Sequence, residues 1–392
     1  MKVSGGPVQV IEFADAEVKR ICVENWGGAD GGTAAVSTRV SGKAIAGIAG
    51  EMTYRQAADV KVIGGQFAGN AIIETFEELR FFTGLLYLGT SQGGAFYNCT
   101  NLRSVILPES LLRLGPSDGY SYSSGVFKNT AIESLSIPDN VSLISDSAFS
   151  GCTNLKTVRW GSSLKYPAHS RYWSNTFHGC SKLERIDNWP ADVKTIGVSD
   201  FYGVKVLDWS FMDFSKINSI EGSAFYGANV KEELVLPLVT SLGSYFVRGS
   251  NIRRLFLPSL NSLTRYEFAY STLQVLDIGG EPSGRIQNSG GRIYNLIIRN
   301  SSVPSITFST VSLINRVFVY AAVYDDFVTT YASLASKTFV IGGQEWIDEF
   351  GSSSEWADYP DGCNPLISTV LGGGDKNIIK SWLLRSNERR AA

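Results

Sequence analysis

Three cysteines that recur at one spacing are the residues best suited to chemistry. Cys99, Cys152 and Cys180 each lie three residues after a phenylalanine, and His178 forms a His-x-Cys pair that hints at zinc. The chain has 2 histidines, His169 and His178, too few for a convincing zinc site. At the matching position other segments hold Thr130, Val204, Ala228, Gly249 and Ser271. Such a position requires a small buried side chain, so we predict structural thiols, no metal site and no cofactor.

A second candidate is Gly89-Thr90-Ser91-Gln92-Gly93, which matches the Gly-x-Ser-x-Gly pattern of a nucleophile elbow. That chemistry requires a strand-to-helix turn at the serine, followed along the chain by an acid and a histidine. Here the pentapeptide falls in a turn just before Phe96, with no parallel α/β framework around it. We therefore interpret it as a chance match in a loop.

The elements that position these residues are repeats. The segment AFYNCTNLRSVILP (95–108) recurs at 148–160, 176–190, 224–237 and 245–258, with weaker copies at 126–138, 200–210 and 267–279. Its anchor phenylalanines lie 21 to 31 residues apart, a spacing typical of a solenoid. In each unit, residues such as Leu102, Val105 and Leu107 point inward from a short strand, which a proline ends. Stacked units share one continuous core.

These repeats, with their aromatic, Gly/Asn, Cys, Leu, Ile and Pro positions, resemble the BspA-like leucine-rich-repeat proteins over about residues 60–300. Residues 11–32, 50–60 and 76–85 resemble the helical cap of such arrays in gut Bacteroidetes and in phages or mobile elements that infect them. Of the calcium-like loop that relatives often carry, only Asp30-Gly31 remains, so we expect no calcium site. The resemblance implies a leucine-rich-repeat solenoid of the α/β type, built mostly of short parallel strands and turns.

The helices of the cap are predicted from capping signals, and the domain boundaries from the positions where the repeat spacing is lost. Asp15 is expected to cap a helix that ends at Gly27-Gly28, and Thr75-x-x-Glu78 to open a second helix that ends near Gly84. Residues 317–341 are similar to the strand–helix–strand segment that closes such arrays. We predict a helical N-terminal cap (1–62), the solenoid (63–300), an α/β C-terminal cap (301–350), and a linker and tail (351–392).

The strand face that points away from the core is the first candidate binding surface. In the repeat register we expect a charged ladder along this face and then an apolar patch, a plausible recognition surface. An ordinary solvated face with cross-strand ion pairs is the alternative. The candidate residues are Arg159, Arg185, Asp187, Asp208, Val235, Phe256 and Asp277.

Asp187 and Asp208 also raise the possibility of a hydrolase. On adjacent strands their carboxylates would lie about 5 Å apart, the separation used by retaining glycosidases. However, an open face excludes no water, and Arg159 and Arg185 would keep both acids ionised. We therefore predict that the chain is not an enzyme.

Two loop insertions, 114–125 and 165–175, form the second candidate binding surface. They place aromatic side chains in polar loops, where such rings stack on sugars or anchor protein contacts, or else fold back as cover. These side chains are Tyr120, Tyr122, Tyr166, Tyr172 and Trp173.

Charge and composition limit the function. A net charge of −2 argues against nucleic-acid binding, and no apolar run is long enough for a membrane span. The N-terminus has no recognisable signal peptide, which raises the expectation of a phage virion beside that of a bacterial cell surface. We predict a non-catalytic scaffold that binds a protein or a cell-surface glycan. The alternatives are a structural virion or tail component, contacting other virion proteins with residues 372–392 as a docking peptide, and a glycan hydrolase.

Overall fold

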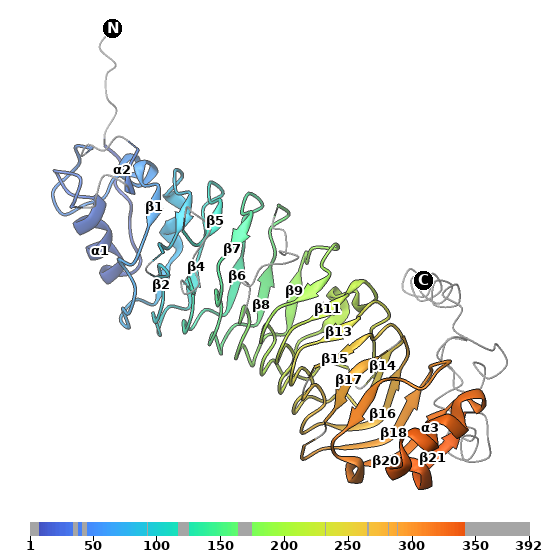
Figure 1. Ribbon diagram of the computed structural model, residues 1–392. Helices are drawn as coiled ribbons and strands as arrows, with labels where there is room; N and C mark the ends of the chain where they lie inside the picture. Colours follow the sequence, from blue (N-terminus) through green and yellow to red (C-terminus); the bar gives the residue numbers. More distant parts are fainter. Residues whose placement is uncertain are drawn as a thin grey trace. The chain divides into compact units, whose positions relative to one another are not determined.

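A computed structural model gives the secondary structure of most of the chain (Figure 1). The chain divides into two compact units. The described residues are 8–33, 38–40, 45–91, 93–116, 125–163, 175–231, 233–264, 266–280, 282–287 and 289–341. Unit 1 comprises Met1–Val193, Gly197–Met212 and Gly227–Asn229. Unit 2 comprises Lys194–Ile196, Asp213–Tyr226 and Val230–Ala392.

Successive repeats of unit 1 contribute short strands to three parallel sheets. The four-stranded sheet orders β1 (Val62–Ile63), β3 (Tyr87–Leu88), β5 (Arg113–Leu114) and β7 (Leu143–Ile144). The two-stranded sheet pairs β2 (Thr75–Phe76) with β4 (Ser104–Val105). The three-stranded sheet orders β6 (Ser134–Ser136), β8 (Thr157–Arg159) and β9 (Arg185–Asp187). Two 3-10 helices, η2 (Glu77–Phe81) and η3 (Trp209–Phe211), also belong to this unit.

Unit 2 contains two six-stranded parallel sheets, and the longest strands lie in the second of them. One orders β10 (Thr195–Ile196), β11 (Ser219–Ile220), β13 (Ser241–Leu242), β15 (Ser262–Leu263), β17 (Ser283–Ile286) and β19 (Ile306–Phe308). The other orders β12 (Glu233–Val235), β14 (Arg254–Leu257), β16 (Thr272–Ile278), β18 (Arg292–Ile298), β20 (Ile314–Val319) and β21 (Thr338–Val340). The helices of this unit are α3 (Tyr324–Thr330) and the 3-10 helices η4 (Phe214–Lys216), η5 (Val311–Leu313), η6 (Ala321–Val323) and η7 (Ala332–Lys337).

The anchor phenylalanines form the centre of the core, as the repeat pattern predicts. All of them, from Phe96 to Phe268, are fully buried. In unit 1 the rings of consecutive repeats stack, with centroids 5.4 to 6.0 Å apart and planes within 22° of parallel. This stack and the parallel strands confirm the leucine-rich-repeat solenoid, because each repeat buries its apolar face only against its neighbours.

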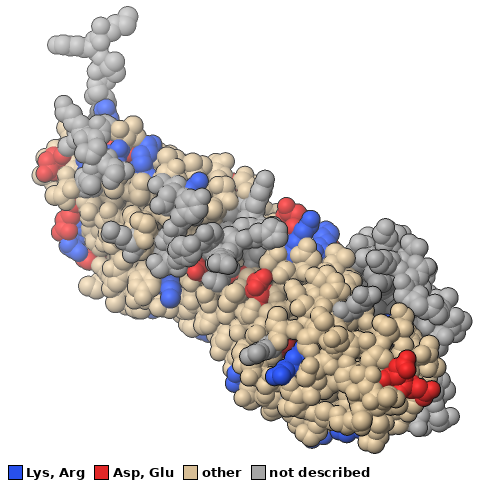
Figure 2. Space-filling view, viewed as in Figure 1, with Lys and Arg blue, Asp and Glu red and all other residues tan. Residues whose placement is uncertain are grey.

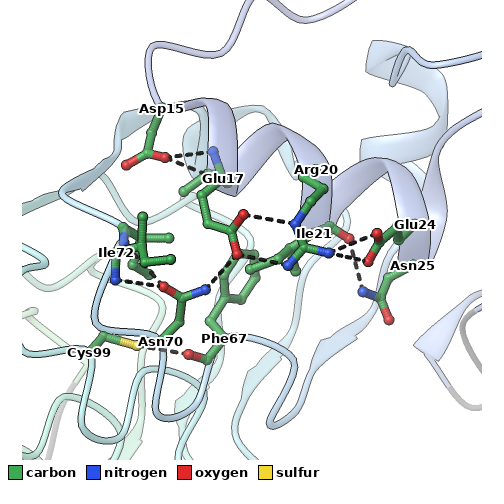
Figure 3. Close-up of polar contacts among 12 residues, drawn as sticks. Asp15, Glu17, Arg20, Ile21, Glu24, Asn25, Phe67, Asn70, Ile72 and Cys99 are labelled. Carbon is green, nitrogen blue, oxygen red and sulfur yellow. Dashed lines mark hydrogen bonds and ion pairs between the residues drawn. The ribbon is translucent and has the colours of Figure 1, made fainter.

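The N-terminal helix α1 (Ala16–Trp26) forms as predicted. The Asp15 carboxylate accepts hydrogen bonds from the amides of Glu17 and Val18, and the helix ends at Gly27. On the outer side of the helix, Arg20 holds the pKa of Glu17 at about 2, against the effect of burial. Glu17 also accepts a hydrogen bond from the Asn70 side chain, which ties α1 to the first repeats (Figure 3).

The second predicted helix start was wrong. Thr75 lies in strand β2, and η2 begins at Glu77 without a side-chain cap. Glu78 instead accepts a hydrogen bond from the Ala14 amide. The capping box occurs at Thr53 and Gln56, which open helix α2 (Tyr54–Asp59).

The closing segment confirms the predicted strand, helix and strand. Strands β20 and β21 pair in parallel, with α3 and η7 in the connection between them (Figure 1). Among the described helices, none is long and apolar enough to cross a membrane. The predicted domain boundaries stay predictions. Residues 342–392, which contain the end of the predicted C-terminal cap and the predicted linker and tail (351–392), lie outside the described residues.

Candidate binding surfaces

The three repeat cysteines are buried, and each thiol donates a hydrogen bond to a backbone carbonyl in the turn of the preceding repeat. The sulfurs of Cys99, Cys152 and Cys180 donate to the carbonyls of Phe67, Phe127 and Phe149, at 2.9, 2.9 and 3.1 Å (Figure 3 for Cys99). Burial raises the pKa of Cys99 to about 12 and that of Cys152 to about 11. These thiols are protonated at neutral pH and satisfy buried carbonyls, which is a structural role.

His178 has a packing role beside Cys180. Its ring stacks on Tyr202, with centroids 4.4 Å apart, and partial burial lowers its pKa. Within the described residues, no group of three or more His, Cys, Asp and Glu side chains is arranged to hold a metal ion.

The Gly-x-Ser-x-Gly pentapeptide closes a small turn. Thr90 and Gly93 pair through both backbone hydrogen bonds, at 2.9 and 3.2 Å. The chain then continues into the turn at residues 95–98. A nucleophile elbow requires a helix at that point, so this geometry agrees with a chance match.

The outward face of β6, β8 and β9 is exposed, and we call it the open face. Its side chains form two in-register rows, Ser134–Thr157–Arg185 and Ser136–Arg159–Asp187. The register of Arg159 beside Asp187 agrees with the sequence prediction. All six side chains are exposed or partly exposed.

Charges on the open face pair locally rather than along the predicted ladder. Arg159 contacts Asp139 at 3.1 Å, and Arg185 contacts Asp187 of its own strand at 3.0 Å. The Ser162 amide and then Arg159 lower the pKa of Asp139. On the side of the molecule drawn in Figure 2, charged side chains form small separate groups, some mixed and some of a single sign. Exposed pairs of this kind contribute little to stability, about 0–1 kcal/mol each.

The prediction that Asp208 extends this ladder was wrong. Residues 206–208 form no strand, and Asp208 caps the 3-10 helix η3 by accepting a hydrogen bond from the Ser210 amide. The backbone amide of Asp208 donates to the Glu184 carbonyl at 2.8 Å. Asp208 therefore lies beside Glu184 and not beside Asp187. The proposed pair of neighbouring catalytic carboxylates therefore does not form at this register.

The row that Asp208 joins was not anticipated, and the five residues that precede Asp208 in it alternate in charge. Each backbone amide donates to the carbonyl of the preceding member, and all members are exposed. In order they are Glu74, Arg103, Glu133, Lys156 and Glu184. Lys156 and Glu133 form an ion pair at 3.1 Å. Counting residues from each anchor phenylalanine finds this row, since Lys156, Glu184 and Asp208 each lie seven residues after one.

The predicted apolar patch of unit 2 is buried, which corrects the second half of the binding face. Phe256 is 4% exposed, and it packs in a cluster with Val275, Ile297, Phe318 and Ile341, against which the partly buried Val235 also packs. In the sheet, Phe256 pairs with Asp277 and Asp277 with Ile297, so this cluster lies on the outward side of the strands. This side of the sheet is a second core, in which Phe256 and Asp277 are buried and not available to a partner, whereas Val235 is partly buried at its edge.

Asp277 is buried in that second core as half of an ion pair. Arg299 donates from Nε to both carboxylate oxygens at 2.8 Å. The two side chains are only 6% and 15% exposed. Burial works to lower the pKa of Arg299, but Asp277 and Tyr320 outweigh it and raise that pKa. A charge pair held this way has a structural role.

The aromatic loop residues lie outside the described residues. Residues 117–124 and 164–174 contain Tyr120, Tyr122, Tyr166, Tyr172 and Trp173, and their binding role stays a prediction.

Comparison with known proteins agrees with the architecture. The family model of the BspA type leucine rich repeat region, in 6 copies, matches residues 76–166, 120–231 and 170–275, which together exceed half of the chain. The chain is a leucine-rich-repeat protein, and it belongs to the BspA type family. That family is one of non-catalytic repeats. No curated protein matches the chain.

Three solved structures match part of the chain, and all are distant in sequence. A leucine-rich repeat protein from Bacteroides ovatus is 20% identical with a TM-score of 0.38, and the match covers 68% of this chain and 66% of that one. The pneumococcal vaccine antigen PcpA is 14% identical with a TM-score of 0.42, and the match covers 77% and 86%. A leucine rich cell surface protein from Faecalibacterium prausnitzii is 16% identical with a TM-score of 0.32, and the match covers 77% and 65%.

Proposed function

We propose that this chain is a non-catalytic binding scaffold that attaches to a protein or a glycan at a bacterial surface through the open face. The observation that carries the proposal is the contrast between two outward sheet faces. In unit 1 the open face presents Arg159, Arg185 and Asp187 to solvent, whereas the corresponding face of unit 2 is a buried core.

The open face has the properties of a recognition surface. Its side chains stand in register on adjacent parallel strands, so they keep a fixed spacing of about 4.8 Å from repeat to repeat. Arginine is enriched in the residues that contribute most to binding at interfaces. Because both ion pairs of this face are exposed, a partner can replace them at a small cost in stability.

The test is a double variant, Arg159→Ala with Arg185→Ala, applied to immobilised extracellular-matrix proteins and mucin glycans. We expect binding by the natural chain and a loss of at least about tenfold in the variant, with unchanged thermal unfolding. Lys182→Ala is the matched control, since Lys182 is an exposed cation that contacts Asn154 and is not among the six side chains of the open face. Equal binding by all three proteins would refute the role of the open face.

The location of the chain tests the other part of the proposal. Producing cells are fractionated into cytosol, envelope and sedimentable particles, and the chain is detected in each by mass spectrometry. Recovery in the envelope agrees with a surface scaffold. Recovery in particles would replace the proposal with a structural component of a virion.

A further inference from the structure

Three tyrosines on adjacent turns of unit 2 adopt a backbone conformation that large side chains rarely take. Tyr245, Tyr266 and Tyr270 have φ angles of 61°, 61° and 59°. Steric contacts of Cβ make this left-handed region unfavourable for a bulky residue. Turns of the other repeats fill such positions with Asn98, Asn129, Ser147, Gly151, Asn175, Gly179, Ser199, Gly203, Ser223 and Gly227. The turn itself does not require tyrosine, so three of them point to a role outside the fold.

Two of these tyrosines, Tyr245 and Tyr270, surround one cation together with Tyr226. The guanidinium carbon of Arg248 lies 4.1 Å from the ring centroid of Tyr270, 5.2 Å from that of Tyr226 and 5.6 Å from that of Tyr245. Tyr245 and Tyr266 stack with centroids 5.4 Å apart and planes 8° from parallel. We call these four tyrosines and Arg248 the tyrosine–arginine cluster.

The cluster is accessible, and its outermost ring is held in place. Tyr270 is 51% exposed, although its ring contacts Arg248. Gly290 packs close against the same ring, since a Cβ at that glycine would lie 2.6 Å from Cδ1 of Tyr270. A tyrosine fixed in this way offers a large contact area at a low cost in conformational entropy.

Arg248 has no acidic partner in the described part of the chain. Its side-chain contacts there are the three rings, and no described carboxylate or carbonyl accepts a hydrogen bond from its guanidinium. A guanidinium carries five N–H donors in a geometry that matches a carboxylate. An anionic ligand would therefore complete the site.

The backbone of these turns favours a sugar over a peptide as the carrier of that anion. The amide of Tyr245 donates to the Tyr266 carbonyl at 2.9 Å, and the amide of Tyr270 donates to the Ser289 carbonyl at 2.8 Å. These groups are thus not free to pair with an added peptide strand, the usual way in which a sheet protein binds an extended chain. The groups that remain are the tyrosine rings, their phenol hydroxyls and the Arg248 cation. The rings suit the apolar face of a sugar, the phenol hydroxyls its hydroxyl groups, and the cation its carboxylate.

We propose that the tyrosine–arginine cluster binds a glycan that contains carboxylate-bearing sugars. The carboxylate pairs with Arg248, and the sugar rings contact Tyr245, Tyr266 and Tyr270. This site lies in unit 2 and is independent of the open face, so either proposal can fail without the other.

The test is isothermal titration of the full chain with three carboxylated probes, namely oligogalacturonate, hyaluronan oligosaccharide and sialyllactose. Neutral oligogalactose and poly-glutamate are the comparison ligands. We expect at least one carboxylated sugar to bind about tenfold more tightly than either comparison ligand, and Arg248→Gln to abolish that preference. Preference for poly-glutamate, or no binding of any carboxylated sugar, would overturn the proposal.

A second variant separates binding from folding. Tyr245→Asn with Tyr266→Asn restores the residue type that other repeats carry, so we expect an unchanged or higher unfolding temperature together with a loss of binding. Tyr97→Asn is the control, because Tyr97 is an exposed ring near Lys128 in unit 1 and should affect neither. A lower unfolding temperature with unchanged sugar binding would show that the tyrosines are structural.

Discussion

The Asp277–Arg299 ion pair offers a sharp test of whether the outward face of unit 2 is closed. Asp277→Asn keeps the shape of the side chain and removes its charge, which leaves the Arg299 cation in a buried site without its carboxylate. Breaking a buried pair in this way costs about 3–5 kcal/mol. If the face were open, as the sequence predicts, the same change would cost about 0–1 kcal/mol.

The assay reads unit 2 alone. Hydrogen exchange of the β16 and β18 amides, followed by mass spectrometry across a urea series, gives the free energy of unfolding of this sheet. Asp187→Asn is the matched control, because its pair with Arg185 is exposed and we expect a loss of at most about 1 kcal/mol. A third variant, Asp277→Leu with Arg299→Met, removes both charges and should recover most of the lost stability. A cost below about 1 kcal/mol for Asp277→Asn would refute the buried pair.

Three further predictions concern the repeats and the N-terminal cap. Phe149→Ala removes a ring from the middle of the stack and should destabilise unit 1 by about 3–5 kcal/mol in urea unfolding, and a loss under about 1 kcal/mol would contradict the stack. The raised pKa values of Cys99 and Cys152, about 12 and 11 against an ordinary 9.0, favour folding below pH 9, so stability should fall as pH rises from 9 through 11 and 12. A Cys99→Ala, Cys152→Ala variant should show a smaller fall over that range, and an identical pH profile would argue against the buried thiols. Asp15→Ala should cost about 1–2 kcal/mol because the carboxylate caps α1, whereas Thr75→Ala should cost less, and the reverse order would restore the helix start that the sequence suggested at Thr75.

Most of the fold was predictable because each repeat carries its own evidence. The buried phenylalanines, the inward leucines and the capping aspartate are local signals, and several copies agree on them. Thr75 and Glu78 show the limit of a local signal, since their spacing fits a capping box although strand pairing with β4 places Thr75 in a sheet. The strand that pairs with a segment decides whether the segment forms a strand or a helix, and a short sequence motif does not identify that strand.

The binding surfaces were harder to predict because exposure depends on what packs against a face. Alternation along a strand separates inward from outward side chains, but it does not tell whether the outward side meets solvent. Thus Arg159 and Asp277 occupy outward positions alike, yet one is exposed and the other buried. Alignment of the repeats by their apolar residues misplaces Asp208, whereas counting from Phe201 gives the observed register.

The tyrosine–arginine cluster is marked in the sequence by exceptions to the repeat pattern. Tyr245 and Tyr266 stand just before an anchor phenylalanine and Tyr270 just after one, at turn positions where other repeats carry Ser, Asn or Gly. A comparison of repeats position by position would have marked them as exceptions. Only the structure shows that Tyr245 and Tyr270 contact Arg248 and that Tyr266 stacks on Tyr245, because the residues come from different turns.

The measurement that tests the central claim most directly is binding of three proteins to one array of matrix proteins, mucin glycans and carboxylated sugars. The natural chain is compared with the Arg159→Ala, Arg185→Ala variant and with the Tyr245→Asn, Tyr266→Asn variant. We predict that the first variant loses ligands of the open face, that the second loses carboxylated sugars, and that each keeps the ligands lost by the other. Binding profiles identical to that of the natural chain in both variants would contradict a scaffold that presents these two surfaces.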